Sequence, residues 1–343
     1  MEPPSTPNID PSELPELSFH AREWIASRHE MIAGAAERHL NQRAKNEVTR
    51  ILRPLGAELS QIAGWADWIK RHHADPNDDD PDTINFLKDR TNAENSRWHY
   101  VDLPVDAFEY SREAYAHFTR DDDVVQMISA SVVVLMGKSN RFSELNALRL
   151  VVHLTGDVHQ PLHVGCGYVG DKNGKPLLVR DPSAAQGLKS DRGGNELILP
   201  IGAGISLHSH WDGLGEVPPA HQDVAVRTRL RPQHVDKLSN MIALRSPTSG
   251  AARVTHAGPP EKWAVRWATS SVLLAREAYR SLEISGLHGG SRPSPSPHGP
   301  TANTFDVNWE GRAAYDARCY PIANEQLKNA AANLAELLNA IWS

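Results

Sequence analysis

HLTGDVHQPLH, residues 153–163, places three histidines and one aspartate within eleven positions. The longer segment 143–157 predicts an α-helix with Ser143 as its N-cap, because apolar residues recur there at helical spacing. His153 and Asp157 are four residues apart on this helix, so their side chains share one face. Pro161 ends the helix and turns the chain, which lets His163 return toward the same place. The stretch predicts a metal site built from imidazole and carboxylate ligands.

A second pair has the same spacing. The segment LHSHWD contains His208 and Asp212, again four residues apart. An isolated pair of this kind is common by chance, but two pairs supply four ligands, and His163 makes five. One zinc ion takes only three or four protein ligands. The ligand count therefore indicates at least two ions.

Further candidates lie upstream. The segment WHYVD contains His99 and Asp102, GWADWIK contains Asp67, and His29 begins an apolar helical pattern. Taken singly, each is more often a surface residue or a satisfied core residue than a ligand. Together with the first pair they come from several predicted helices, and helical bundles build metal sites in this way.

The rest of the pattern predicts one mainly α-helical domain over residues 24–343, preceded by a disordered leader at 1–23. Loop insertions are expected at about 73–95, 165–206 and 285–304, where Gly, Pro, Asp and Lys gather. Five segments have helical spacing of apolar residues: 29–51, 57–72, 143–157, 260–282 and 327–341.

The composition of the chain limits which classes of function are compatible with it. Apolar residues form 40% of the 343 residues, and no apolar run approaches the roughly 18 residues that span a membrane. The net charge of −6 does not indicate a nucleic-acid binder unless bound metal ions supply the positive charge. The two cysteines, Cys166 and Cys319, form no C-x-x-C pair, which excludes a thiolate zinc site. The Pro-rich, acidic start of the sequence does not predict a signal peptide.

Seven segments, in order, resemble those of the S1/P1 nuclease family, zinc-dependent nucleases whose fold is related to that of bacterial zinc phospholipases C. They are WADWIK, WHYVDLP, HLTGDVHQPLHVG, RGGN, LHSHWD, WATSSVLLAREAY and QLKNAAANLAELLN. The block GDVHQPLHVG is the most specific of them, and the resemblance covers about residues 24–343. It implies a multi-helix phospholipase C/P1 nuclease-like fold.

The resemblance also implies a cluster of three zinc ions, of which the donors in this sequence best support two. The first ion would be held by Asp67, His99, His153 and Asp157, and the second by His163, His208 and Asp212. The third would be held by His29, by Asp157 as a bridge, and by the amino nitrogen and carbonyl oxygen of an N-terminal Trp24.

The third site is where this chain departs from the family pattern. The family opening resembles W-G-x-x-G-H, whereas this sequence has WIASRH, in which neither glycine occurs. Trp24 is internal, and an internal peptide nitrogen has no free lone pair for a metal. The third site therefore needs removal of residues 1–23, or another donor such as His20, or it binds more weakly.

The activity implied is cleavage of single-stranded RNA or DNA to 5′-phosphate products, with 3′-nucleotidase action as an additional expectation. Asp67 and Asp102 are candidate catalytic carboxylates, which would orient the attacking water or take its proton. For Asp102, a hydrogen-bonding partner of a histidine ligand is an equal alternative. Tyr100 is a candidate for stacking a base, or ordinary core. Asn195 is a candidate substrate contact, or the cap of a turn.

Two alternatives remain open at this point. A lipid phospholipase C of the same fold resembles H-x3-E at the last ligand pair, where this chain has Asp212. A zinc-binding protein with impaired activity is the other. His159 and His210 are predicted not to be ligands, with His159 donating to backbone and His210 facing away. A monomer is expected, and the resemblance further implies a secreted or periplasmic setting.

Overall fold

The computed structural model describes residues 28–201, 204–214, 256, 258–288 and 303–343. The predicted leader at 1–23, Trp24 and most of the predicted loop at 285–304 lie outside these residues. Within the described ranges, no helix combines the length and the apolar character needed to cross a membrane.

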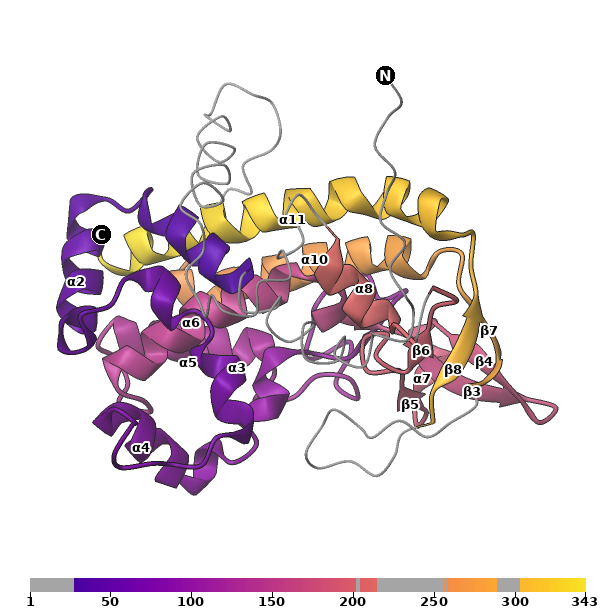
Figure 1. Ribbon diagram of the computed structural model, residues 1–343, viewed down its shortest axis with the longest axis horizontal. Coiled ribbons are helices and arrows are strands. Elements are labelled where there is room, and N and C mark those ends of the chain that lie inside the picture. The colour runs from indigo at the N-terminus through magenta and orange to yellow at the C-terminus, as the bar shows by residue number, and fades with distance from the viewer. Residues whose placement is uncertain (1–27, 202–203, 215–255, 257, 289–302) are drawn as a thin grey trace, which may run out of the picture.

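Helix α6, Glu144–His159, lies at the centre of the molecule and carries the motif that dominates the sequence (Figure 1). Ser143 caps it by accepting a hydrogen bond from the backbone N–H of Asn146, as predicted. Every residue from 145 to 159 is buried. A helix buried on all sides needs neighbours all round, and α6 contacts α5 (Val124–Leu135), α10 (Trp263–Tyr279) and α11 (Arg312–Ile341).

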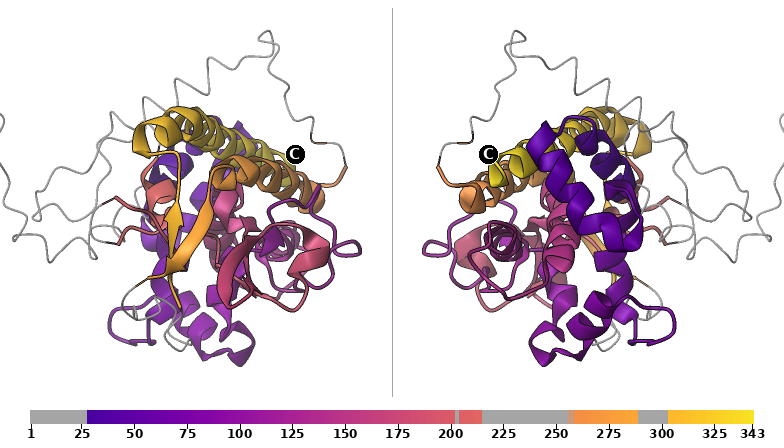
Figure 2. Two further views of the ribbon diagram at one scale, coloured as in Figure 1. Left: turned by 90° about the vertical axis from the view of Figure 1, so that its right-hand side faces the viewer. Right: turned by 90° about the vertical axis from the view of Figure 1, so that its left-hand side faces the viewer.

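The two long C-terminal helices form one side of this core. Helix α10 and helix α11 run next to each other along the length of the molecule, and both contact α6 (Figures 1 and 2). The predicted apolar stripe of α11 is confirmed, because Ala331, Leu334, Leu338 and Ile341 are buried. Helix α10 begins after the 3₁₀ turn η8, Pro260–Lys262, within the segment 260–282 expected to be helical.

The N-terminal helical segment differs from the expectation of one helix over 29–51. Residues 28–37 are helical, and a second helix, α2 (Gln42–Leu52), begins after a break. Asn41 causes the restart, since its side chain accepts a hydrogen bond from the N–H of Ala44 in extended backbone geometry. An asparagine favours such a cap over a helix interior, and apolar periodicity alone does not register this preference.

The prediction of a single helix over 57–72 was also wrong. The structure has the 3₁₀ turn η3 (Leu59–Ile62), the four-residue helix α3 (Trp65–Trp68) and the 3₁₀ turn η4 (Ile69–Arg71). Glu58 and Gln61 form a reciprocal capping box that closes the first turn separately. The first turn is therefore closed separately from the short helix that follows it.

Short strands lie at the end of the molecule opposite α2 and the C-terminus, on the right of Figure 1. Strand β1 (Leu103–Pro104) pairs in parallel with β2 (Gly165–Cys166). One three-stranded sheet has the order β4-β3-β5, and another has the order β6-β8-β7. Their strands are β3 (Tyr168–Lys172), β4 (Lys175–Val179), β5 (Lys189–Ser190), β6 (Leu197–Ile198), β7 (Glu283–Leu287) and β8 (Phe305–Asn308).

The remaining elements are short helices and turns between these layers. They are η2 (Arg53–Leu55), α4 (Pro81–Lys88), η5 (Arg90–Asn92), η6 (Asn95–His99), η7 (Pro161–His163), α7 (Pro182–Ala185) and α8 (Leu207–Gly213). Helix α4 falls inside the segment 73–95 that was expected as a loop. Asp80 caps it and Pro81 occupies its first position, a strong start signal for a helix. The mainly α-helical architecture is confirmed.

Candidate metal centre

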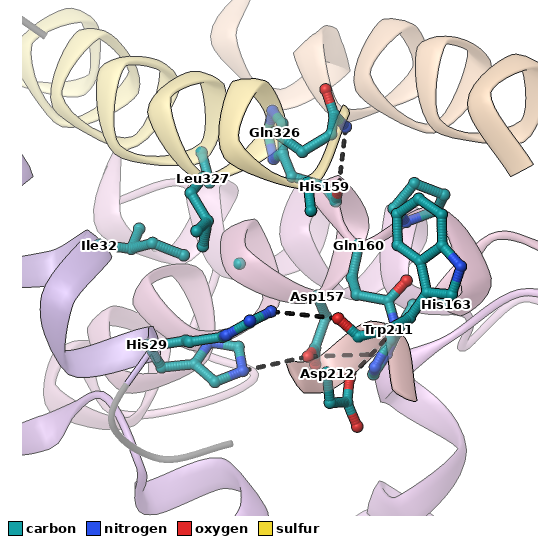
Figure 3. Close-up of a pocket in the computed structure, with 15 residues that line it drawn as sticks. His29, Ile32, Asp157, His159, Gln160, His163, Trp211, Asp212, Gln326 and Leu327 are labelled. Atoms are coloured by element: carbon teal, nitrogen blue, oxygen red, sulfur yellow. Dashed lines mark hydrogen bonds and ion pairs between the residues drawn. The ribbon is translucent and has the colours of Figure 1, made fainter. Parts of the chain in front are cut away.

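Asp157 is the centre of a cluster of histidines. Its Oδ1 lies 3.3 Å from Nε2 of His29 and 3.6 Å from Nδ1 of His163. Its Oδ2 lies 2.8 Å from Nδ1 of His99 and 3.2 Å from Nε2 of His153. Figure 3 shows His29 and His163 approaching the carboxylate from opposite sides. Each oxygen of one buried carboxylate therefore faces two imidazoles, which is the arrangement expected of a bridging ligand.

Asp67 completes the first predicted ligand set. Its Oδ1 lies 3.5 Å from Nε2 of His153 and 3.7 Å from Nδ1 of His99. Lys70, three residues later, brings Nζ to 2.5 Å from the same oxygen. The structure thus places Asp67, His99, His153 and Asp157 around one small volume, although they come from α3, η6 and α6.

The second predicted set comes together beside the first. His208 and Asp212 lie on α8, which Ser206 caps, and Nε2 of His208 lies 3.8 Å from Oδ2 of Asp212. The ring of His163 lies 4.9 Å from that of His208, centroid to centroid. Potential ligand atoms of His163, His208 and Asp212 all lie within 4.8 Å of one another. Three side chains separated by up to 49 positions therefore converge on one point.

Three of the histidines have their tautomer fixed by the backbone. In each, Nδ1 donates a hydrogen bond to a carbonyl oxygen, which can only accept. The pairs are His153 with Ala63 at 2.7 Å, His163 with His99 at 2.9 Å, and His208 with Gly193 at 2.8 Å. Because Nδ1 is used by the backbone, Nε2 is the nitrogen that faces the cluster and could bind a metal ion, and the hydrogen bond orients the ring.

The electrostatics of the cluster favour bound cations. Burial alone would raise the pKa of Asp157, but the imidazoles of His153 and His163 hold it well below its usual value. Burial lowers the pKa of His153, yet the carboxylates of Asp157 and Asp67 together raise it to about 10. Two buried atoms, His153 Nε2 and His29 Nδ1, make no hydrogen bond within the described part of the chain. Two ionised carboxylates among orphaned imidazole nitrogens fit a metal centre with nitrogen and oxygen donors.

His29 reaches the cluster because residue 156 is a glycine. A Cβ at Gly156 would lie 2.4 Å from Nδ1 of His29, closer than any real contact. The His29 ring stacks on His153, with centroids 3.8 Å apart and planes 18° from parallel. His29, Asp67 and His153 form a third group whose potential ligand atoms lie within 4.8 Å of one another. Trp24, the other predicted ligand at this site, lies outside the described residues.

The segment RGGN holds the second set in place. Gly193 has φ +61°, and a Cβ there would lie 2.1 Å from the carbonyl oxygen of Leu162. Its own carbonyl accepts the hydrogen bond from His208. The buried carboxylate of Asp191 accepts from the N–H of Gly194 at 2.9 Å and from the hydroxyl of Tyr279 at 2.9 Å. Asp191 therefore anchors the turn that orients His208.

The two consecutive glycines, Gly193 and Gly194, were the feature of the sequence that could have indicated this turn. Two consecutive glycines at positive φ mark a turn that another side chain cannot replace. The connection to His208 could not be found from the sequence, because it crosses from a turn to a separate helix. Gln160 is another residue that orients a candidate ligand and that the sequence analysis did not identify. Its Nε2 donates a hydrogen bond to Oδ1 of Asp212 at 3.2 Å.

The three other predicted site residues have different neighbours. Asp102 is near Ser190, whose hydroxyl lies 3.4 Å from its Oδ2, and burial raises its pKa. None of the contacts found for Asp102 within the described ranges is with a cluster residue, so its catalytic role stays a prediction. The guanidinium of Arg120 lies 4.9 Å from the ring centroid of Tyr100. Asn195 donates from Nδ2 to the carbonyl of Arg192 at 2.9 Å, the turn-capping alternative.

The histidines predicted not to be ligands point elsewhere. His159 donates from Nδ1 to the carbonyl of Thr155 at 2.7 Å, and Asn333 lies 2.7 Å from its Nε2. Burial lowers its pKa to about 4, so it is neutral near pH 7. His210 pairs with Asp316 on α11 at 2.6 Å. His159 therefore donates to backbone and His210 faces away from His208, as predicted. Cys166 and Cys319 are buried free thiols.

Arg28 is a site residue that the sequence analysis missed. A cavity of about 60 Å³ adjoins the cluster, with Asp157 and Asp212 on one side and Ile32 and Leu327 toward α11 (Figure 3). Arg28 also lines it, and its guanidinium donates to the backbone carbonyls of Trp211 and Leu214 at the end of α8. The residue before His29 thus ties the N-terminal helix to the helix that carries His208. In WIASRH, Arg28 stands where the family pattern has its second glycine, and this difference could have drawn attention to it.

Comparison with known proteins agrees with this geometry. The family model described as S1/P1 Nuclease matches residues 24–343. Endonuclease 4 of Arabidopsis thaliana is 27% identical over 181 residues, which cover 49% of this chain and 53% of that protein. Endonuclease 2 of the same plant is 27% identical over 169 residues, covering 46% and 50%. The chain spans about half the length of the curated relatives it matches.

Proposed function

The chain belongs to the S1/P1 nuclease family, and from that premise we propose that it is a zinc-dependent phosphodiesterase acting on single-stranded RNA or DNA. The proposed products carry 5′-phosphates, and 3′-nucleotidase activity is proposed with them. The observation that carries the proposal is the position of Asp157, whose two oxygens face four histidines. A carboxylate shared in this way suits a multi-ion centre, which is the arrangement that phosphodiester hydrolysis uses.

The chain offers donors for more than one ion. Asp67, His99, His153 and Asp157 would hold the first, and His163, His208 and Asp212 the second. His29 and Asp157 would contribute to a third. Zinc ions at these positions would supply Lewis-acid chemistry, neutralising phosphate charge and making a water more acidic.

The protein's own residues have separate tasks in this proposal. Asp67 is partly exposed, at 29% of its side chain, so it can reach solvent as well as the cluster. It would orient the attacking water or take its proton. Lys70, beside it, would hold the ionised carboxylate in place. Tyr100 would contact a base, and Asn195 would shape the turn near the second set.

A phospholipase C activity is the second candidate, because the same kind of centre cleaves phosphodiesters in lipids. The cavity beside the cluster has apolar side chains, Ile32 and Leu327 among them, which is the observation in its favour. The family membership favours the nuclease. We also propose that the protein is a monomer, and resemblance to that family is the ground for proposing a secreted or periplasmic setting.

Substrate choice tests the proposal. We expect the zinc-loaded protein to cleave a single-stranded oligonucleotide at least about tenfold faster than the same sequence in a duplex, because a paired base must leave its stack first. The measurement is hydrolysis of end-labelled single strand, duplex and phosphatidylcholine vesicles, with the product ends identified by mass spectrometry. Release of phosphocholine without cleavage of the single strand would instead establish the phospholipase.

A further inference from the structure

Trp68 is an exposed aromatic residue directly after Asp67. Its exposed fraction is 47%, whereas Trp65 in the same short helix is 8% exposed and donates from its indole to Thr83 at 2.9 Å. Single exposed apolar residues are common and by themselves indicate nothing. Two further features distinguish Trp68 from an ordinary surface residue: its ring is held in place by His72, and it directly follows the candidate ligand Asp67 in the chain.

One face of the Trp68 ring is covered by another aromatic ring. The ring of His72 stacks on it, with centroids 3.8 Å apart and planes 28° from parallel. His72 is fixed in turn, because its Nε2 lies 2.9 and 2.8 Å from the two carboxylate oxygens of Asp79. The N–H of Asp75 donates to Asp79 at 2.6 Å. A ring ordered in advance loses less conformational entropy when a ligand stacks on it.

The position of Trp68 suits a nucleic acid. Consecutive Cα atoms are about 3.8 Å apart, so its backbone is next to that of Asp67, whose carboxylate faces His99 and His153. Lys70, two residues further on, places its ammonium beside Asp67, so a positive charge lies near the candidate metal centre. Proteins that bind single strands combine cationic groups along the backbone with aromatic rings that stack bases.

We propose that Trp68, backed by His72, is a stacking platform for a base that flanks the phosphate to be cleaved in single-stranded nucleic acid. The proposal rests on the proposed function and adds a contact separate from Tyr100. It gives the chain a preference for strands that extend beyond the cleaved bond. Stacking tolerates any base, so the platform favours single strands over duplex without imposing sequence preference.

The test compares W68A and W68F with a matched control, F108A. Phe108 is also an exposed aromatic, at 73%, with a side chain covering one face, since the guanidinium of Arg276 lies 5.2 Å from its ring. The readout is kcat/KM for a single-stranded decamer divided by kcat/KM for bis(p-nitrophenyl) phosphate, which has no base. Zinc content is measured for every variant.

We expect W68A to lower this ratio by about five- to 150-fold, mainly through a higher KM for the decamer, because one stacked base is worth that much. W68F keeps a ring and should recover most of the loss, and H72A should lower the ratio by less than W68A. F108A should leave it unchanged. An unchanged ratio in W68A, or equal losses on both substrates together with lost zinc, would overturn the proposal.

A binding measurement separates this proposal from the proposed function. Fluorescence anisotropy of a labelled single-stranded decamer, with the metal-free protein, reports binding without hydrolysis. If the wild-type protein binds the decamer more tightly than W68A but cleaves nothing when zinc is added, the nuclease proposal fails and the platform stands. If cleavage occurs and W68A binds and cleaves like the wild type, only the platform fails.

Discussion

Replacing Asp157 with asparagine is expected to lower nuclease activity by more than about a thousandfold and to reduce the zinc bound per chain. Removing a hydrogen-bonding partner of a ligand typically costs about 10- to 100-fold, and removing a shared ligand should cost more. The amide keeps the shape of the side chain but has one oxygen and no charge. It therefore cannot face His29 and His163 on one side and His99 and His153 on the other.

The measurements for D157N are zinc content by elemental analysis and hydrolysis of single-stranded DNA. D316N is the matched control, since Asp316 also pairs with a histidine, His210, but away from the cluster. D316N should keep its zinc and its activity. If D157N binds as much zinc as the wild type, Asp157 is not a bridging ligand.

Substitution by alanine should have different effects at the two histidines of helix α8. H208A should lower activity by at least about a hundredfold and remove the second ion, because His208 is one of only three candidate donors in that group. H210A should retain both, since His210 faces Asp316 on α11. The two positions are two residues apart in the same short helix, so a general loss of folding would affect both variants.

Thermal unfolding and zinc content of the two variants decide between a ligand effect and a folding effect. H210A loses the 2.6 Å hydrogen bond to Asp316 that links α8 to α11 and is expected to unfold at a lower temperature than H208A while keeping more activity. Equal losses of activity in two variants that both stay folded and keep the same zinc content would mean that His208 is not a ligand.

The sequence predicted the local parts of the site well, because they follow from helix geometry. The spacing of His153 and Asp157 on one face, the helix end at Pro161 and the orientation of His159 toward its own backbone all depend on a few neighbouring residues. The resemblance to a family then indicated which distant residues join them. The helix lengths before residue 73 were wrong, because local caps at Asn41 and Glu58 overrode the apolar pattern.

The remaining parts depend on contacts between segments far apart in the chain. The space that Gly156 leaves for His29, the hold of Asp191 on the glycine turn and the link from Arg28 to α8 each join separate elements. No periodicity in the sequence encodes such contacts. These contacts explain how the candidate ligands are oriented, whereas the sequence mainly predicted which residues the candidates are.

Zinc content per chain, measured with hydrolysis of single-stranded DNA on the same samples, tests the central claim most directly. We predict at least two zinc ions in the full-length chain, and a third in a form that begins at Trp24. Hydrolysis should disappear when a chelator removes the zinc and return when zinc is restored. Two or more bound zinc ions with no hydrolysis of single strands, in both the full-length and the 24–343 forms, would contradict the proposal that this metal centre is a nuclease site.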